Sequence, residues 1–210
     1  TELEARRIGR MLREAGINWN LAPVVDVGYN PANPVIVGPG RSYGANPDRV
    51  TAHARAFVQG MRAEGVLTSL KHFPGHGSSF EDSHAGFVDV TETASLEVEL
   101  PPYRTLIAEG LAASVMTAHV VNRRLDGRRP ATLSRPTVTG LLRRELGYDG
   151  VVVSDDLHMG AIERRYGMDE AAVLALRAGV DVLLLSAETV PDGGSGSGTV
   201  LAAIRRALER

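Results

Sequence analysis

The sequence predicts an α/β fold in which helices cover a parallel β-sheet, and three observations lead to this prediction. Five short apolar runs have the length and composition of buried parallel strands. A helical pattern follows each run, and the long polar loops all follow the carboxyl ends of the runs. Strands that alternate with helices form βαβ units, which bury a parallel sheet under helices on at least one face. The expected strands are 19–25, 66–71, 113–117, 151–154 and 182–185.

Helices are expected where capping residues bracket a helical periodicity. The chain opens on an amphipathic segment, residues 1–16, that no strand precedes. Asn46, Pro47 and Asp48 supply a cap, a first-turn proline and a first-turn acid for the next helix, which should stop at Gly65. The remaining helices are expected at 91–110 with an interruption at the two prolines 101–102, at 134–147, at 169–179 and from about 198 to the C-terminus.

This alternation fits two architectures, a (β/α)8 barrel and an open doubly wound sheet. The long loops lie at the carboxyl ends of the strands, as in the active-site face of a barrel, but an open sheet places its loops similarly. Five units in 210 residues are also fewer than a complete barrel of about 250 residues contains. The glycine-rich stretch 192–198 is expected to be a loop, because no Lys-Ser/Thr follows it as in a phosphate-binding P-loop.

The composition excludes several classes of protein. A net charge of −2, from 23 basic and 25 acidic residues, gives no single-sign field that would attract a nucleic acid. No apolar run approaches the roughly 18 residues of a membrane span. The absence of cysteine excludes disulfides and thiolate sites and leaves the cellular compartment open. We expect a single domain over residues 1–210, without a second domain, that binds a small neutral or mixed-charge ligand.

The segment 71–84 carries the densest chemistry. It holds three histidines, one lysine and two carboxylates in fourteen residues, where the second expected strand ends. Pro74, Gly75 and Gly77 impose a tight, irregular path on the chain. Polar groups on such a turn at a strand end are typical of a functional pocket.

Three interpretations compete for these histidines. A metal site would need His72, His76 and His84 around one ion, and their spacing matches no compact zinc pattern, so we expect no metal. A purely structural role suits His76 best, because glycines flank it. An acid/base role suits His84: Asp82, two residues earlier, would accept from one ring nitrogen and raise the basicity of the other.

A second cluster lies at residues 151–157. A β-branched run that ends in Asp155 and Asp156 is typical of a buried strand that delivers a carboxylate to the mouth of a pocket. One of the two aspartates is expected to cap the following turn. The other would suit a nucleophile or a general base. Periodicity does not say which is which.

These motifs together resemble family 3 glycoside hydrolases, in the β-N-acetylhexosaminidase branch that cleaves N-acetylglucosamine from peptidoglycan fragments. The segments that carry the resemblance are 71–77, 82–84 and 154–157, with 20–27, 41–44 and 115–119 in the same order. The resemblance implies a (β/α)8 TIM barrel, a small carbohydrate substrate and no cofactor. It also implies a retaining glycosidase that removes terminal β-linked N-acetylglucosamine through a covalent glycosyl-enzyme.

Individual residues acquire roles from the same resemblance. Asp155 matches the nucleophile and Asp156 its supporting neighbour, while His84 matches the acid/base and Asp82 its partner. The residues that match positions holding the sugar hydroxyls are Arg41, Lys71 and His72. A histidine repels an incoming anion less than a carboxylate does, so phosphorolysis stays open as a variant of hydrolysis.

The sequence departs from this branch in two ways. Relatives have an upstream strand ending in Gln-Glu-Gly-Gly, with an Asp and an Arg that bind the sugar, and the 210 residues contain neither. Many relatives also carry Asp after the Gly-His-Gly turn, where this chain has Ser78 and Ser79. The five strands would be the last five of eight, so we expect a missing N-terminal segment or self-association at the open sheet edges. We expect weak or no activity from the 210 residues alone.

Two alternatives remain. A family 3 β-glucosidase usually takes an acid/base carboxylate from a second domain, whereas this chain carries Asp82 and His84 in a loop. A non-catalytic sugar-binding fragment would keep Arg41 and Lys71 and turn over no substrate.

Overall fold

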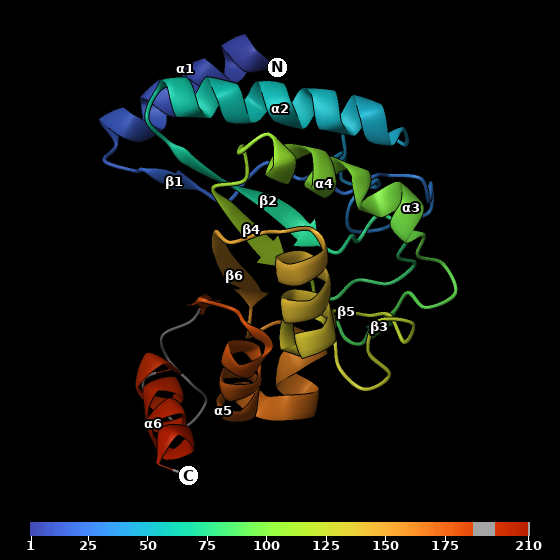
Figure 1. The fold of residues 1–210 in the computed structure, drawn as a ribbon, viewed down its shortest axis with the longest axis vertical. Coiled ribbons are helices and arrows are strands. Elements are labelled where there is room, and N and C mark those ends of the chain that lie inside the picture. Colours follow the sequence, from blue (N-terminus) through green and yellow to red (C-terminus); the bar gives the residue numbers. More distant parts are fainter. Residues whose placement is uncertain (187–195, 210) are drawn as a thin grey trace.

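The computed structural model describes residues 1–186 and 196–209, and its centre is a five-stranded parallel sheet (Figure 1). The strands are β1 (Trp19–Asn20), β2 (Leu67–Phe73), β4 (Ser114–Thr117), β6 (Val151–Asp156) and β7 (Val182–Leu184), adjacent in that order. Every pairing is parallel; Val115 lies opposite Val152, and Val153 opposite Val182. The five strands expected from the sequence are confirmed.

The strand order decides between the two architectures. A doubly wound sheet reverses its strand order at a switch point, whereas here each strand is added on the same side of its predecessor. Right-handed crossovers that all progress in one direction place the helices on one face of the sheet. The fold is therefore a curled half-barrel of the (β/α)8 type with its helices outside (Figure 1).

Helices cover the outer face of the sheet, and strands and helices share one large apolar core cluster. The helices are α1 (Glu2–Glu14), α2 (Pro47–Ala63), α3 (Leu96–Glu99), α4 (Pro101–Ala108), the short 3-10 helix η1 (Ala131–Leu133), the π-helix η2 (Pro136–Glu145), α5 (Gly160–Ala178) and α6 (Gly196–Leu208). Helix α2 begins as expected: the Asn46 side chain accepts from the N–H of Arg49, and Pro47 opens the first turn. Buried strand residues such as Leu70 and Val152 belong to the same core cluster as helical residues.

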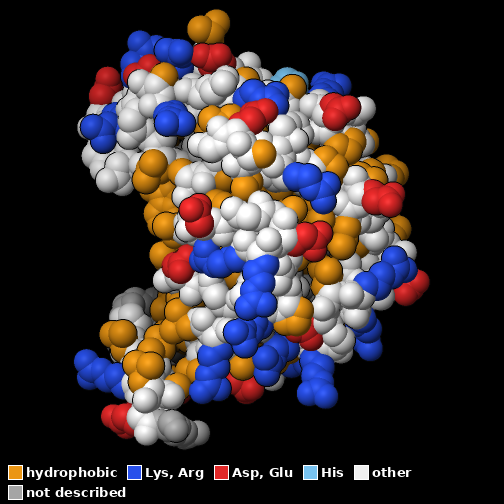
Figure 2. All heavy atoms as spheres, viewed as in Figure 1, with side chains coloured by type: hydrophobic (Ala, Val, Ile, Leu, Met, Phe, Trp, Pro, Cys, Tyr) orange, Lys and Arg blue, Asp and Glu red, His pale blue; other side chains and the backbone are white. Residues whose placement is uncertain are grey.

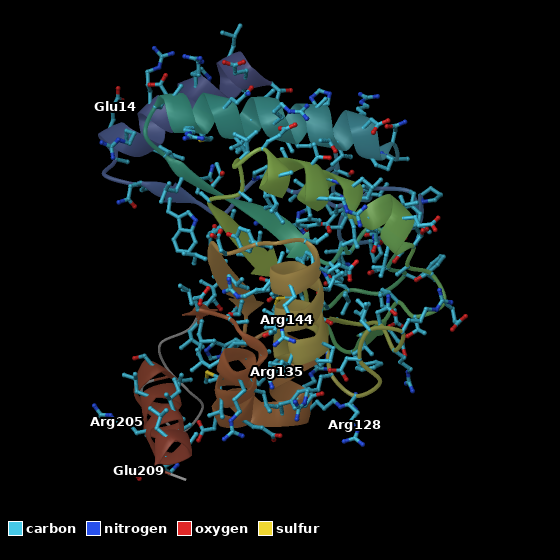
Figure 3. All side chains as sticks on the ribbon, viewed as in Figure 1. Glu14, Arg128, Arg135, Arg144, Arg205 and Glu209 are labelled. Carbon is cyan, nitrogen blue, oxygen red and sulfur yellow. The ribbon has the colours of Figure 1, made fainter. Side chains whose placement is uncertain are left out.

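Helix η2 has one buried apolar side and one exposed charged side, as a helix in the outer layer of the fold requires. Leu141 and Leu142 are buried, whereas Arg135 and Arg144 project from the opposite, exposed side, as does Arg128 from the preceding loop (Figure 3). An apolar stripe with charged residues opposite it is typical of a surface helix. Within residues 1–186 and 196–209, no helix combines the length and apolar character needed to cross a bilayer.

Strand β1 is shorter than the expected range 19–25. Pro23 has no N–H to donate, so a regular ladder cannot run through it. Pairing with β2 resumes as an isolated bridge between Val24 and Lys71. Strands β2 and β6 instead run further than expected, to Phe73 and Asp156, so the polar residues at their ends belong to the sheet.

The helix expected from Thr91 starts at Leu96 instead. Asp89 accepts from both the N–H and the hydroxyl of Thr91, and this pairing fixes a turn where the helix was expected. The loops after β2 and β4 also form a two-stranded parallel sheet that the sequence did not indicate, β3 (Val88–Asp89) with β5 (Val120–Val121).

Helix α5 begins at Gly160, nine residues before the expected start. It is broken at Gly167, whose φ of 67° lies in the left-handed region that glycine adopts without strain. Helix α6 begins at Gly196 rather than near residue 198. Residues 192–195 of the predicted glycine-rich loop lie outside the described residues.

The inner face of the curled sheet is apolar and open at the amino ends of the strands. Trp19, Leu67, Val151 and Val182 contribute to the lining of a cavity of about 210 Å³ there. Leu67 is 59% exposed and Val151 40% exposed. Figure 2 shows hydrophobic side chains along a hollow in the outline of the molecule on this side. Within the described residues, β1 and β7 each pair on one side only, so both are open edges.

Candidate active site

Polar side chains converge at the carboxyl ends of the strands, opposite the apolar cavity. Lys71 and His72 lie on β2, and Asp155 and Asp156 end β6. The β2–β4 register shifts within the same stretch of β2, and such an irregularity re-aims side chains next to functional sites. The two densest clusters found in the sequence therefore lie on two strands that flank β4.

Asp26, in the loop after β1, organises this end of the sheet and is 1% exposed. Its carboxylate accepts from the N–H of His72 at 3.2 Å, from Nδ1 of His72 at 2.7 Å and from the N–H of His76 at 2.8 Å. Burial raises the pKa of Asp26, but the charge and hydrogen bond of His72, with His76, outweigh it and hold that pKa below its ordinary value. Sequence reasoning gave Asp26 no role; the available signal was a carboxylate inside an apolar run at a strand end.

Asp26 also fixes the orientation of the His72 ring. With Nδ1 directed to the carboxylate, Nε2 lies 3.4 Å from Nη2 of Arg41. A guanidinium can only donate, so in the neutral form of His72 the ring proton lies on Nδ1 and Nε2 is the acceptor. Arg41 is held in turn by donation to the carbonyl of Val35 at 3.2 Å. The structure thus brings together Arg41 and His72, which lie 31 residues apart.

Lys71 is half-buried, and its ammonium group donates no hydrogen bond to any residue in the described ranges. Burial and then the charge of Arg41 lower the pKa of Lys71, while the carboxylates of Asp155 and Asp26 act in the opposite direction. These interactions place one ammonium group within the electrostatic reach of both carboxylates.

The carboxylate of Asp156 is fully engaged in shaping the chain after β6. It accepts from the N–H groups of His158 and Ser186, both at 3.1 Å, and from the Ser186 hydroxyl. Burial raises the pKa of Asp156, but the hydrogen bonds from Ser186 and His158 outweigh it, so the pKa lies below its ordinary value. Asp156 is the aspartate that caps the following turn.

The carboxylate of Asp155 makes fewer contacts than that of Asp156. In the described part of the chain it accepts one hydrogen bond, from the adjacent N–H of Asp156 at 2.9 Å. It is half-buried, and its charge acts on both Lys71 and His119. The two neighbouring aspartates therefore differ in how many hydrogen bonds their carboxylate oxygens accept within the described residues.

His119 supports the end of β6 from the chain that follows β4. Its ring is 1% exposed, with Nε2 2.9 Å from the carbonyl oxygen of Asp156 and Nδ1 2.8 Å from Oγ1 of Thr132. Burial lowers the pKa of His119, although the charge of Asp155 opposes this. A carbonyl oxygen only accepts, so Nε2 carries the proton. The sequence indicated His119 only as part of a strand end and gave it no role.

Asp82 and His84 form the pair that their spacing predicts. One carboxylate oxygen, Oδ1 of Asp82, lies 2.6 Å from Nδ1 of His84 and accepts from the His84 N–H at 2.8 Å. Partial burial raises the pKa of Asp82, but the hydrogen bonds and charge of His84 outweigh it and leave the pKa below its ordinary value. Both side chains are exposed, and Nε2 of His84 is left for a partner outside the loop.

His76 orders the loop that carries this pair. Its Nδ1 is 2.7 Å from Oγ of Ser79, and its Nε2 is 3.0 Å from Oγ of Ser83. Burial lowers the pKa of His76, against the opposing charge of Asp26. The buried ring thus ties together two serines from either end of the loop, which fits the structural interpretation of His76.

The loop with His84 lies directly on the segment that follows Asp155. The carbonyls of Ser83 and His84 accept from the N–H groups of Ala161 and Gly160, both at 3.2 Å, at the start of α5. No hydrogen bond joins the His84 ring to the Asp155 carboxylate within the described residues. The structure therefore joins the two segments through their backbones, while their side chains make no hydrogen bond to each other in the described residues.

The histidines show no metal-binding arrangement. Both ring nitrogens of His76 are occupied by serine hydroxyls, and His72 is held by Asp26 and Arg41. In residues 1–186 and 196–209, no three or more His, Cys, Asp or Glu side chains are grouped as metal ligands.

Comparisons with known proteins agree with the fold and the motifs. Residues 3–208 match the model of the glycosyl hydrolase family 3 N terminal domain. The chain is 46% identical over 187 residues to the β-hexosaminidase LpqI of Mycobacterium tuberculosis, covering 86% of this chain and 47% of that protein. It is 41% identical over 194 residues to β-hexosaminidase A of Pseudoalteromonas piscicida, covering 86% of this chain and 32% of that protein.

A solved structure is similar over nearly the whole chain. It is a glycoside hydrolase family 3 β-N-acetylglucosaminidase from Paenibacillus sp. str. FPU-7, with a TM-score of 0.89 and 44% identity. The similarity covers 98% of this chain and 38% of that one. The chain thus spans a third to a half of the length of these relatives.

Proposed function

The chain belongs to glycosyl hydrolase family 3, and from this membership we propose that it is a retaining β-N-acetylhexosaminidase. The substrate would be terminal β-linked N-acetylglucosamine, cleaved through a covalent glycosyl-enzyme. The names of the relatives, β-hexosaminidases and a β-N-acetylglucosaminidase, support this choice of sugar. We further propose that residues 1–210 form one catalytic domain, supported by the extent of the family match and the large apolar core cluster.

The unequal occupation of the two neighbouring aspartates carries the proposal. A nucleophilic carboxylate needs an oxygen free to approach the anomeric carbon. The Asp156 oxygens accept from the backbone and from Ser186, whereas within the described residues Asp155 accepts only the adjacent N–H of Asp156. Lys71 adds a positive charge that interacts with the Asp155 carboxylate. Asp155 is therefore the proposed nucleophile.

His84 is the proposed acid/base and Asp82 its orienting partner. The 2.6 Å contact to Oδ1 directs the Nδ1 proton toward Asp82, so Nε2 is the atom that exchanges a proton with the substrate. An imidazole titrates near neutrality, so it needs little adjustment to act first as an acid and then as a base. The exposed position of the ring suits a residue that meets the leaving group at the mouth of a site.

Arg41, Lys71 and His72 are the proposed ligands of the sugar hydroxyls. Lys71 has unused donors, and the Asp26 carboxylate holds His72 in a fixed orientation next to Arg41. Polar groups that are already held in position bind a sugar without a cost of reordering at the moment of reaction.

The proposed reaction has two steps. An oxygen of Asp155 bonds to the anomeric carbon while the glycosidic bond breaks, and the leaving oxygen keeps that electron pair and takes the proton of His84. Water then attacks the anomeric carbon as His84 removes its proton, and the bond to Asp155 breaks. Two successive inversions retain the configuration.

A covalent trap tests the nucleophile. The intact protein is incubated with a fluorinated N-acetylglucosaminyl fluoride, which slows the second step, and digested for mass spectrometry. We expect a glycosylated peptide with the sugar on Asp155, and no adduct in Asp155→Asn. A sugar on Asp156, or turnover without any adduct, would overturn the assignment.

Substrate preference tests the sugar. The intact protein should have a higher kcat/KM for an aryl N-acetylglucosaminide than for the matching aryl glucoside, and it should release N-acetylglucosamine from peptidoglycan fragments. A preference for the glucoside would favour the β-glucosidase alternative. Binding of N-acetylglucosamine without turnover of either compound would favour a non-catalytic protein.

A further inference from the structure

Glu99, the last residue of α3, places a carboxyl group behind the turn that follows β2. Its side chain is 2% exposed. Oε1 accepts from the Tyr29 hydroxyl at 2.9 Å, whereas Oε2 has no hydrogen-bond partner in the described part of the chain. A buried oxygen without a donor is costly, and a carboxylate more so than a neutral carboxyl group.

Three more buried side-chain oxygens lack a hydrogen-bond partner in the described residues, Oγ of Ser69 among them, and the other two interact with the Glu99 carboxyl group. These two are Oγ of Ser78, which lies beside Glu99 without completing a hydrogen bond, and the hydroxyl oxygen of Tyr103 on α4. Buried polar atoms that remain unpaired need an explanation. A proton on Glu99 removes the net charge that would otherwise be buried in this cluster.

Glu99 forms the back wall of the turn at residues 74–77. A Cβ atom at Gly75 would lie 2.5 Å from Oε2 of Glu99, so the carboxyl group rests directly on the turn backbone. The next residue, His76, donates its N–H to Asp26 and holds Ser83 through its ring. A short series of contacts thus leads from Glu99 to the loop that carries the acid/base pair.

The groups around Glu99 act on its ionisation in opposite directions. They are Tyr29 from the loop after β1, Tyr103 from α4 and the negatively charged Asp26, while His72 and His76 direct their hydrogen bonds to Asp26. Burial raises the pKa of Glu99 to about 7; the Tyr29 hydrogen bond opposes this rise, and the charge of Asp26 adds to it. The neutral and the ionised forms are therefore both accessible near neutrality.

We propose that neutral Glu99 is a positioning residue that holds the turn 74–77, and that its ionisation loosens the acid/base loop at residues 78–84. The second half of this inference rests on the proposed function, because it assigns the loop its catalytic role. Loss of the proton to solvent would leave a buried negative charge beside Asp26 and against the Gly75 backbone, and the turn would have to move to admit water.

Hydrogen exchange of the intact protein tests the positioning role without requiring activity. After correction for the intrinsic rate, exchange of residues 74–84 should be about tenfold faster at pH 8.5 than at pH 6 in the wild type. It should be independent of pH in Glu99→Gln, which keeps a neutral group of the same shape. Glu97→Gln, an exposed change on the same helix, should behave as the wild type. An equal pH response in the wild type and Glu99→Gln, or no response in either, would overturn the proposal.

Two further measurements complete the test. Tyr29→Phe removes a hydrogen bond that favours the ionised form, so the exchange transition should move to higher pH; an unchanged transition counts against the proposal. On the alkaline side, kcat for an aryl N-acetylglucosaminide should be about tenfold higher in Glu99→Gln than in the wild type at similar KM, and superimposable profiles would overturn the link to catalysis. If no variant has activity, the proposed function fails, while hydrogen exchange still decides the role of Glu99.

Discussion

A Cβ atom at residue 77 would lie 1.8 Å from the carbonyl oxygen of Val27, so Gly77 rests directly on the backbone that follows β1. On the other side of the same turn, Gly75 rests on Glu99. Two glycines thus let the turn pass between a strand end and a buried carboxyl group. The position of His76 between them follows from backbone packing.

Replacing Gly77 with alanine should destabilise the protein by about 3 kcal/mol, because the new methyl group overlaps a backbone oxygen that cannot move away cheaply. Urea denaturation of the intact protein measures the change. Gly86→Ala is the matched control: it lies in the same loop, has open space around it and should leave stability unchanged within about 0.5 kcal/mol. Equal midpoints for the two variants would contradict the clamped geometry.

Substitutions of the two aspartates at the end of β6 should affect different properties, turnover in one case and stability in the other. Asp155→Asn should lower kcat by about 10³-fold or more with an unchanged Tm, because it removes the proposed nucleophile and few structural contacts. Asp156→Asn should lower Tm, because its carboxylate accepts from His158 and Ser186. Steady-state kinetics and thermal unfolding of both variants check this. Undiminished turnover by Asp155→Asn would exclude it as the nucleophile.

Removal of the charge of Asp82 should weaken acid catalysis. In Asp82→Asn the His84 ring loses the carboxylate that orients it, and kcat should fall by about 10²-fold or more for a substrate with a poor leaving group. An activated aryl leaving group needs less protonation. The rate of the first step with such a substrate should therefore fall less in Asp82→Asn. Pre-steady-state kinetics with both substrates separates the two cases. Glu81→Gln, an exposed neighbour, is the control, and an equal loss in it would point to general disturbance of the loop.

Asp26 should contribute stability that depends on pH. Its pKa is lower in the folded protein than in the unfolded chain, so its contribution is fully present above the unfolded value of about 3.9 and is lost as pH falls through the folded value. Asp26→Asn should therefore be less stable than the wild type at pH 7, by about 3 kcal/mol for a broken buried pair. The difference should shrink below about pH 4. Denaturant titrations across pH measure it, and a difference that grows in acid would reverse the assigned sign.

The strands were predictable because their signal is local. An apolar run such as 151–154 is bounded within a few residues, and its alternation with helices gives a parallel sheet without any knowledge of contacts. The errors lie where a side chain overrode the local pattern. The hydrogen bond from the Thr91 N–H to Asp89 forms a turn where the sequence predicted the start of a helix, and Pro23 interrupts the pairing of β1. The half-barrel could not be predicted from periodicity, because it follows from the order of the strands in the sheet, and periodicity does not reveal that order.

The candidate site was predictable in its residue types and less so in its connections. The spacing of Asp82 and His84 implied a pair, and the structure has the two in contact. Asp26 and Glu99 were missed because their partners lie far away in sequence: Asp26 contacts His72 across 46 residues, and Glu99 contacts Tyr29 across 70. A single carboxylate in an apolar segment does not indicate which distant group it meets.

The sequence by itself determined which chemical groups stand at the ends of which strands, because short-range periodicity and the motif at 71–84 are properties of neighbouring residues. Only the tertiary structure decided which hydrogen-bond partners these groups have. It joins Asp156 to Ser186, whereas Asp155 has a single, adjacent donor among the residues that the structure describes. The physical reason is that hydrogen bonding and burial depend on groups that folding brings together from distant parts of the chain, and these determine the reactivity of a carboxylate.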